Sequence, residues 1–505
     1  MLHWVNKIIK KEFIRYLILF LLPLIGNAQT QGTSYSSVGK GVATTFLTDY
    51  QCLGINPSAL GWGTGYDGKH FTFGSSEFGF GISSDVLTKG KLSNFMQTIK
   101  NQVFGGNYTA SELESQKSSL VNYVNAGVAL DMTYNWAGIS YQSKVFGGLG
   151  FNIRETYQWY TKLSQNTSDV IFNGKYATIF DSLRIANNGD TSIIQNTTIT
   201  NPDSLSMVIG GFLKNPNSLN DLLKGSQIKM SWDRSYNFGY GRKIIGINNA
   251  IELYAGIGAR IIKSMAMFDL DGRSSKASLI SAFAPSFNLS TINALQGKTI
   301  NLSSTDFLPP AIGNGYSFDY AMSAIIGGKL KIALAFNNIG LITYDKNIYK
   351  LKDTLIHDVT ISNLYDFTTT NTIEQLVKKG GIVTLEGTNK YTIATPANFR
   401  LGSSIHFKRL NIGIDIVAPL NSNQPGNIRN AVFSLGGDLK LFKWLQISLG
   451  YFGGGIYANN LPVGVTFIRN EGKFECGIAS RDAISFFSDR SHSLSIALGF
   501  ARFRF

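Results

Sequence analysis

Residues 251–262 read IELYAGIGARII, and side chains of two kinds alternate along the stretch. Ile251 and Leu253 fall on the apolar parity, whereas Glu252 and Arg260 fall on the other. Successive side chains of a β-strand point to opposite faces, so the pattern predicts a strand with one apolar and one mixed face. Strands of a soluble sandwich also alternate in this way, so one such strand does not distinguish a soluble fold from a membrane barrel.

The same alternation recurs along the chain in long segments, many of them joined by very short turns. Every short turn falls on one side of the implied sheet and every long loop on the other, which is typical of an outer-membrane barrel. We therefore predict an all-β fold, a transmembrane antiparallel up-and-down barrel of about 14 strands. The predicted strands are 70–84, 125–142, 148–163, 232–240, 251–268, 316–325, 330–337, 399–407, 411–418, 431–441, 444–451, 463–468, 474–481 and 494–505.

The barrel itself is predicted to span residues 69–505, with both termini in the periplasm. Residues 278–290 do not fit, because one more strand would break the even count, so we expect them in an outer loop or inside the lumen. The long extracellular loops are predicted at about 85–122, 164–228, 270–314 and 340–396.

The first 28 residues have the three parts of a secretory signal. A basic region containing Lys7 and Arg15 precedes the apolar run YLILFLLPLIG, and small residues end at Ala28. The apolar run is shorter than the roughly 20 residues that a spanning helix needs. We expect cleavage after Ala28 and export toward a Gram-negative outer membrane.

The composition agrees with an exported barrel. Charged residues make up 15% of the 505-residue chain, against roughly a quarter in soluble domains. The formal net charge of +14 could indicate nucleic acid, but an exported chain meets anionic lipid headgroups instead. We expect outer-membrane lipid as a partner, and no nucleic acid.

Motifs for catalysis and metal binding are absent from the sequence. No Gly-x-Ser-x-Gly or His-Glu-x-x-His pattern occurs, and GKGVATT lacks the spacing of a phosphate loop. We predict no enzyme activity, no cofactor and no metal. Cys52 and Cys476 could pair in an oxidising compartment or stay free, because pairing cannot be read from sequence.

Charged residues on the parity opposite the apolar stripes predict a lumen that is filled with water or plugged, since charges there need polar partners. The segment 29–68 precedes the first strand and is the natural plug. The residues predicted to line the lumen are Asp131, Asp233, Glu252, Arg260, Asp319, Arg400, His406, Asp415, Asp438, Glu475 and Arg481.

The stretch GINPSALGWG, residues 54–63, carries an Asn-Pro-Ser-Ala-Leu turn just before the first strand. This motif resembles the N-terminal hatch of the FadL-like outer-membrane family, which includes fatty-acid and hydrocarbon transporters and the PorV-type shuttle. LPPAIGNGYSFDYA, FNNIGLITYDKN and TPANFRLGSSIHF look like a Bacteroidetes group of that fold with unknown function. The resemblance implies a 14-stranded barrel. The implied hatch residues are Asn56, Pro57, Ser58, Ala59, Leu60 and Trp62.

The resemblance leaves two functions open. One is a passive conduit for a small, mostly apolar solute. A conduit of that kind favours an apolar pocket, whereas the lumen face predicted here is charged and rich in glycine. The other is a non-transporting accessory barrel in a secretion or assembly machine, with outer-membrane or periplasmic proteins as partners.

The chain ends on Phe503, Arg504 and Phe505. A last strand that closes on an aromatic residue resembles the recognition signal of the barrel-assembly machinery, which implies that role for Phe503 and Phe505. These two residues fall on the parity opposite Leu494 and its apolar neighbours, so a bulge near Ala501 is expected.

Overall fold

The computed structural model describes fifteen parts of the chain: residues 34–84, 86, 121–143, 145–187, 190–198, 208–247, 250–274, 277–283, 309–352, 355–359, 384–421, 425, 430–454, 457–483 and 493–505. The predicted signal segment 1–28 lies outside them. Helices within them are short and lie in the N-terminal segment or beyond the barrel wall. They are α2 (Tyr35–Val38), η1 (Asp49–Cys52), η2 (Pro57–Trp62), α5 (Gln165–Asn173), η3 (Gly174–Tyr176), η4 (Asn196–Thr198) and α7 (Leu219–Leu223), together with a helical stretch at 121–126.

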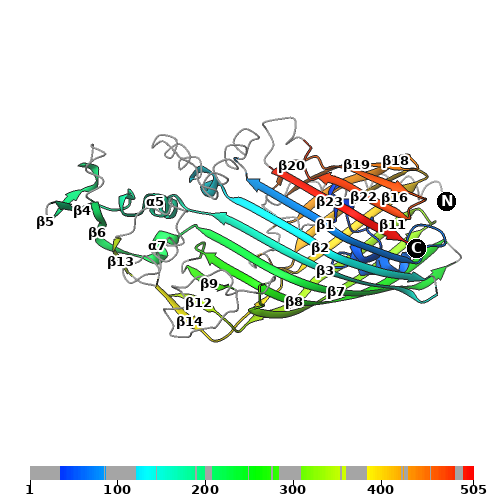
Figure 1. The fold of residues 1–505 in the computed structure, drawn as a ribbon, viewed down its shortest axis with the longest axis horizontal. Helices are drawn as coiled ribbons and strands as arrows, with labels where there is room; N and C mark the ends of the chain where they lie inside the picture. Colours follow the sequence, from blue (N-terminus) through cyan, green and yellow to red (C-terminus); the bar gives the residue numbers. More distant parts are fainter. Residues whose placement is uncertain are drawn as a thin grey trace, which may run out of the picture.

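Among the described residues, fourteen strands pair antiparallel, each with the next, into one closed ring (Figure 1). The last strand closes the ring on the first, from Thr72↔Arg504 to Ser83↔Ser493. The predicted fold is confirmed, and each predicted strand overlaps one ring strand. The ring strands are β1 (Phe71–Ser84), β2 (Val128–Ser143), β3 (Gly147–Lys162), β7 (Gln227–Ile247), β8 (Ile251–Asp271), β10 (Gly313–Ile326), β11 (Leu330–Tyr344), β16 (Asn398–Phe407), β17 (Leu410–Pro419), β18 (Val432–Phe442), β19 (Leu445–Gly454), β21 (Val463–Arg469), β22 (Phe474–Ser480) and β23 (Ser493–Arg504).

The two ends of the barrel differ in how the strands are connected. At one end, which we call the short-turn end, neighbouring strands join through turns of a few residues, and the C-terminus lies there (Figure 1). At the other, the long-loop end, connections such as 163–226 and 345–397 run far longer. The short-turn connections are 144–146, 248–250, 327–329, 408–409, 443–444 and 470–473.

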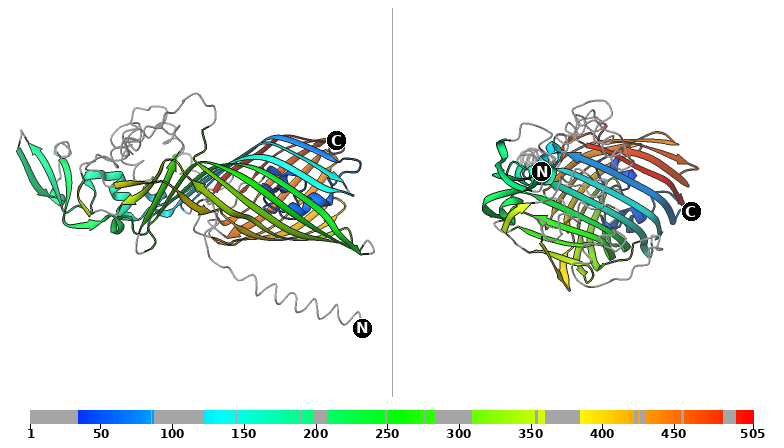
Figure 2. Two further views of the ribbon diagram at one scale, coloured as in Figure 1. Left: turned by 90° about the horizontal axis from the view of Figure 1, so that it is seen from below. Right: turned by 60° about the vertical axis from the view of Figure 1, so that its left-hand side comes forward.

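Further strands lie at the long-loop end. Residues 278–283 form one of them, β9, which pairs with β8 and β12 and prolongs the wall without adding to the ring; residues 284–290 lie outside the described chain. A separate sheet, in the order β13-β6-β4-β5, projects beyond this end (Figures 1 and 2). These strands are β4 (Ser182–Asn187), β5 (Asp190–Gln195), β6 (Val208–Ser218), β9 (Ser278–Phe283), β12 (Ile348–Lys352), β13 (Leu355–Val359), β14 (Thr384–Thr388), β15 (Tyr391–Ala394) and β20 (Tyr457–Asn460).

The alternation in the sequence separates the two faces of the wall. On β10, the outward Met322 is 63% exposed, whereas the neighbouring inward Ala321 is buried. On β8, Ile257 is 59% exposed between the buried Gly256 and Gly258. A closed ring with an apolar outer surface is the pattern of a barrel that faces lipid. Among the described residues, no helix is long and apolar enough to cross a membrane.

The last strand contains the expected irregularity. The β22–β23 ladder shifts register between Glu475 and Gly477, which pair with Arg502 and Gly499. One extra residue therefore lies on β23 in the region of Ala501, where the sequence predicted a bulge. Arg502 and Arg504 face the lumen as a result, and Phe505 faces outward with 65% of its surface exposed.

Candidate functional site

The N-terminal segment, described from residue 34, lies inside the barrel at the short-turn end (Figure 2). We call residues 34–68 the plug. Pro57 stands in the first turn of η2, where its missing N–H costs nothing. Asn56 precedes it, donates from Nδ2 to the carbonyl of Thr44 at 2.8 Å, and accepts from Ser58 Oγ at 2.6 Å. These bonds fold the plug back on itself.

The plug has an apolar centre of its own. Ala59 and Leu60 are fully buried in it, and Trp62 packs against its edge. Cys52 is also part of it, and burial raises the pKa of its thiol, so it stays protonated. Cys476 lies on β22, and both cysteines are free. The remaining members of the centre are Ala43, Leu47, Tyr50, Leu53 and Ile55.

Glycines of the wall let the plug lie directly against the strands. A Cβ atom on Gly436 would overlap the carbonyl oxygen of Lys40, and one on Gly256 would overlap the backbone of Ser58. Glycine within a strand is typical of a place where another backbone approaches closely. The other wall glycines at which a Cβ would overlap or press on the plug are Gly74, Gly138, Gly148, Gly150, Gly239, Gly241, Gly402, Gly413, Gly450, Gly464, Gly477 and Gly499.

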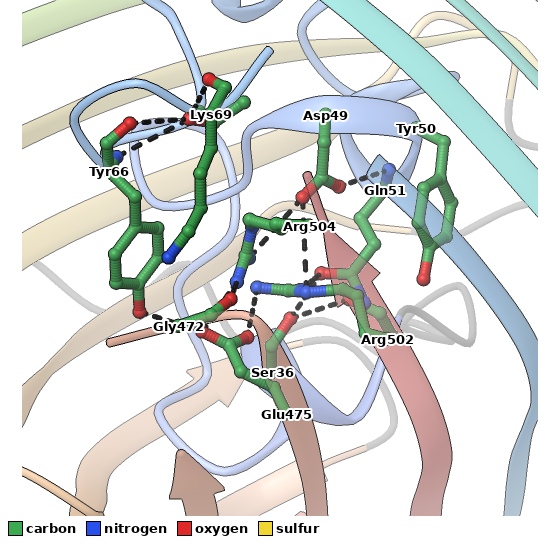
Figure 3. Close-up of polar contacts among 12 residues, drawn as sticks. Ser36, Asp49, Tyr50, Gln51, Tyr66, Lys69, Gly472, Glu475, Arg502 and Arg504 are labelled. Atoms are coloured by element: carbon green, nitrogen blue, oxygen red, sulfur yellow. Dashed lines mark hydrogen bonds and ion pairs between the residues drawn. The ribbon is translucent and has the colours of Figure 1, made fainter. Parts of the chain in front are cut away.

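Four charged residues join the plug to the end of the last strand (Figure 3). Glu475 accepts from Arg502 Nη2 at 2.5 Å and from Arg504 Nη1 at 2.7 Å. Asp49 Oδ2, in η1 of the plug, lies 3.5 Å from Arg504 Nη2 and 3.9 Å from Arg502 Nε. We call these four residues the latch. Its two positive and two negative charges balance, which makes their burial tolerable.

Tyr66 connects the end of the plug to the latch. Its hydroxyl donates to Glu475 Oε1 at 2.8 Å, and the Arg504 guanidinium lies 4.8 Å from its ring centroid. Burial raises the pKa of Tyr66, with the nearby Glu475 carboxylate adding to the shift, so the hydroxyl stays a donor. The latch therefore contacts the plug at two points in its sequence.

Glu77 on β1 holds a second point of the plug. It accepts from the hydroxyl of Tyr50 at 2.8 Å and from Gln51 Nε2 at 2.5 Å. Burial raises the pKa of Tyr50 well above its usual value, so this hydroxyl stays protonated and donates. Tyr50 also fits over Gly74 and Gly138, where a Cβ atom would overlap its ring.

Further polar contacts hold the plug around its circumference. Lys40 Nζ pairs with Asp438 at 2.6 Å. Asp415 Oδ2 accepts from the backbone N–H groups of Ala43 at 2.8 Å and Thr44 at 2.9 Å. The hydroxyl of Ser323 lies 2.7 Å from that of Ser58 and 3.0 Å from Trp62 Nε1. The plug is thus fixed to β10, β17 and β18 as well as to the latch.

A pocket of about 70 Å³ lies in the lumen beside Gly54 and Ile55 of the plug. Arg260 lines it, donates to Asn338 Oδ1 at 2.8 Å and lies 3.5 Å from Asp319. Arg154 also lines it, and donates to the carbonyl of Leu53 at 3.4 Å. Asp233 Oδ1 has no hydrogen-bond partner in the described chain. The remaining lining residues are Thr156, Gln158, Ser235, Ile262, Ile342 and Pro396.

The other residues predicted to line the lumen are spread along its length. Arg481 reaches Asp131 at 2.5 Å, and both are buried. Arg400 is buried in the same way. Glu252 pairs with Lys243 at 3.0 Å near the short-turn end, and the exposed His406 lies near that end of β16. The structure therefore brings Asp233, Arg260 and Asp319 together beside the plug.

Sequence reasoning missed Asp49, Glu77, Arg502 and Arg504 as plug contacts. The alternation of arginine with phenylalanine at the end of the chain could have indicated two of them. If a bulge turns Phe503 and Phe505 outward, Arg502 and Arg504 must point into the lumen. No such pattern marked Asp49. Within the described residues, no group of three or more His, Cys, Asp or Glu side chains is placed to hold a metal ion.

The strand register and the enclosed plug define the class of protein, a plugged barrel of fourteen strands. Among solved structures, the chain is similar to the Ralstonia pickettii toluene transporter TbuX, at 10% identity over 94% of this chain and 98% of that one, with a TM-score of 0.42. It is also similar to the Pseudomonas putida toluene transporter TodX, at 10% identity over 95% and 99%, with a TM-score of 0.39.

The chain is also similar to a Pseudomonas aeruginosa FadL homologue, at 10% identity over 95% of this chain and 98% of that one, with a TM-score of 0.35. These solved structures are FadL-family outer-membrane channels. No family model matches the sequence, and no curated protein matches it. At these similarities, the fold assignment rests on the closed strand pairing of the chain itself.

Proposed function

We propose that the protein is an integral outer-membrane barrel that serves as a passive conduit for a small, mostly apolar solute and is closed by its plug. The apolar outer surface supports the membrane setting. The short-turn end, with the C-terminus and the plug, then faces the periplasm, because bacterial barrels keep their short turns on that side. The mature N-terminus starts in the periplasm as well.

One observation carries the proposal: an apolar cluster in the long-loop half adjoins the polar pocket beside the plug. Ile262 and Ile342 belong to both, and Met265 and Tyr344 continue the cluster away from the plug. A site with apolar walls and a few polar anchors suits a mostly apolar ligand. We infer that the solute has an apolar body and a polar end that meets Arg154 beside the plug.

The plug supplies the gate in this proposal. Its polar contacts are to side chains and backbone of the wall, whereas the strands of the wall satisfy their backbone groups with one another. The wall does not need the plug to close its hydrogen bonds. Displacing the plug should therefore open a path for water and solute while the barrel stays in the membrane.

Deletion of residues 31–65 tests the proposal. The shortened protein should insert in the outer membrane and keep heat-modifiable gel mobility. It should also conduct more than the intact chain in planar bilayers and make cells sensitive to bulky antibiotics. An inserted deletion protein that conducts no more than the intact chain would show that residues 31–65 do not act as a gate.

A second candidate is the accessory role in a secretion or assembly machine. The projecting sheet of β4, β5, β6 and β13 favours it, because it extends beyond the barrel and exposes apolar residues such as Ile193. Isolation in mild detergent separates the two functions. Stoichiometric partner proteins without bound solute would support the accessory role, and bound solute without partners would support the conduit.

A further inference from the structure

An apolar groove of about 590 Å³ crosses the outer face of the barrel wall. It extends over β1, β2, β3, β7, β8 and β10, and nearly all of its lining surface is apolar. Aromatic rings and aliphatic side chains that point away from the lumen form its sides. They include Phe71, Tyr141, Leu149, Phe238, Ile257 and Phe318.

Glycines form the floor of this groove. Gly150 and Gly239 line it from outside, while Leu53 and Leu60 of the plug lie against the same residues from inside. A Cβ on Gly239 would overlap Leu53, and one on Gly150 would lie 3.2 Å from Leu60 Cδ2. The absence of side chains at these two positions lets the plug come close on the inner face, while the sides of the groove come from the alternate residues of the same strands, which point outward.

A cation stands at the short-turn end of the groove. Phe238, Tyr240 and Arg242 lie on the same outward parity of β7, and the first two line the groove. Arg242 is exposed and follows Tyr240 by two residues, about 7 Å along a strand. In the described part of the chain no ion pair involves Arg242, whereas its neighbour Lys243 pairs with Glu252.

We propose that this groove binds one phospholipid from the periplasmic leaflet, with an acyl chain along the apolar walls and its phosphate at Arg242. The inference rests on the proposed membrane setting. In that setting the groove faces the bilayer, so acyl chains are what covers it. A guanidinium is well suited to a phosphate because it can donate two parallel hydrogen bonds. Phenylalanine and tyrosine rings add large apolar contact areas for the chain.

Two substitutions address the two ends of the proposed site. Arg242→Gln removes the cation and leaves the groove intact. Ala259→Phe fills the groove from its own outward-facing lining and leaves the cation. Lys408→Gln is the matched control, because Lys408 is an exposed cation in a short turn on the far side of the ring, away from the groove.

Native mass spectrometry of the detergent-purified full-length barrel, titrated with palmitoyl-oleoyl phosphatidylglycerol, measures the binding. We expect one retained lipid on the intact chain and on Lys408→Gln, and at least tenfold weaker retention on Arg242→Gln and Ala259→Phe. Equal retention by all four proteins, or equal loss in Lys408→Gln, would overturn the site and indicate non-specific annular lipid.

Conductance and heat-modifiable mobility of the same proteins keep this outcome separate from the proposed function. If the variants lose the lipid but still insert, the membrane setting stands and the site is supported. If the intact chain does not insert in membranes at all, the membrane setting fails, and the lipid site fails with it.

Discussion

Arg504 Nη2 lies 3.5 Å from Asp49 Oδ2, so the penultimate residue of the chain contacts the plug that begins near its start. Arg504 also belongs to β23, whose pairing with β1 closes the ring. The strand that completes the barrel therefore supplies the charges that hold the plug. The ring closure of β23 on β1 and the attachment of the plug therefore share the same residues.

Asp49→Asn should loosen the plug. Asparagine tolerates the positive φ of 53° at this position, so the change removes charge and little else. Breaking one side of a buried ion pair costs about 3 to 5 kcal/mol. Among the described residues, Arg502 and Arg504 would keep Glu475 as their one carboxylate partner. We expect higher conductance in planar bilayers with unchanged heat-modifiable mobility. Asp67→Asn, an exposed change in the same plug, serves as the control, and equal conductance of the two variants would contradict the latch.

Gly436→Ala should unseat the plug at a second place. The added methyl group overlaps the carbonyl of Lys40, and overpacking of this kind costs about 1 to 3 kcal/mol. We expect raised antibiotic sensitivity and conductance. Gly246→Ala provides the comparison, because a Cβ there meets only the end of Lys243, at 3.9 Å. If Gly436→Ala changed neither antibiotic sensitivity nor conductance, the wall and plug would not touch at β18.

Arg154→Gln should reduce uptake of a solute with a carboxylate at one end. A hydrogen bond to a charged group contributes about 1.5 to 3 kcal/mol, which corresponds to at least a tenfold loss. Uptake of an uncharged analogue of the same size should change far less. Uptake of both solutes is measured in liposomes with the purified protein reconstituted in their membrane. Arg409→Gln, which changes an exposed arginine of a short turn, is the control. A parallel loss for both solutes would argue against a polar anchor.

The proposed orientation predicts which side of the membrane each turn faces. Lys346→Cys lies in a long connection and should react with a membrane-impermeant maleimide on intact cells. Lys408→Cys lies in a short turn and should react only after the outer membrane is permeabilised. The unmodified chain gives the background from Cys52 and Cys476. The reverse labelling pattern would invert the topology.

Phe505→Ala should slow assembly of the barrel. Phe505 lies outward at the end of the last strand, and its ring centroid is 6.4 Å from those of Phe71 and Phe503. The resemblance to a barrel-assembly signal implies that the assembly machinery recognises the Phe505 side chain before the strands close into a barrel. Pulse-chase measurement of the heat-modifiable fraction should show a delay. Phe500→Ala, an outward residue of the same strand with 58% exposure, should assemble at the normal rate.

The wall could be predicted from the sequence because each of its strands meets the same constraint. A strand between lipid and lumen must alternate, and the alternation gives both its existence and its faces. The sheet of β4, β5, β6 and β13 was not predicted, because strands outside the wall follow no such rule. Residues 164–228 therefore read only as a loop, although they contain α5 and three of these strands.

The contacts of the plug depend on partners that no local pattern connects. Lys40 and Asp438 are almost 400 positions apart, and Asp49 and Arg504 are farther still. Parity placed Asp438 and Glu475 on the inner face, but it carries no information on which plug residue each would meet. Such pairings depend on how the whole ring curves around the plug.

Between Leu53 and the groove outside, the protein is only one layer of main chain thick at Gly239. An outward-facing fluorophore at position 259 would thus be separated from the plug by a single sheet and would lie on the outer, lipid-facing side of the wall. Its emission, quenched by a spin label attached to the plug, would rise when the plug departs. Gating could then be followed optically in an intact bilayer, with the reporter dye outside the solute path.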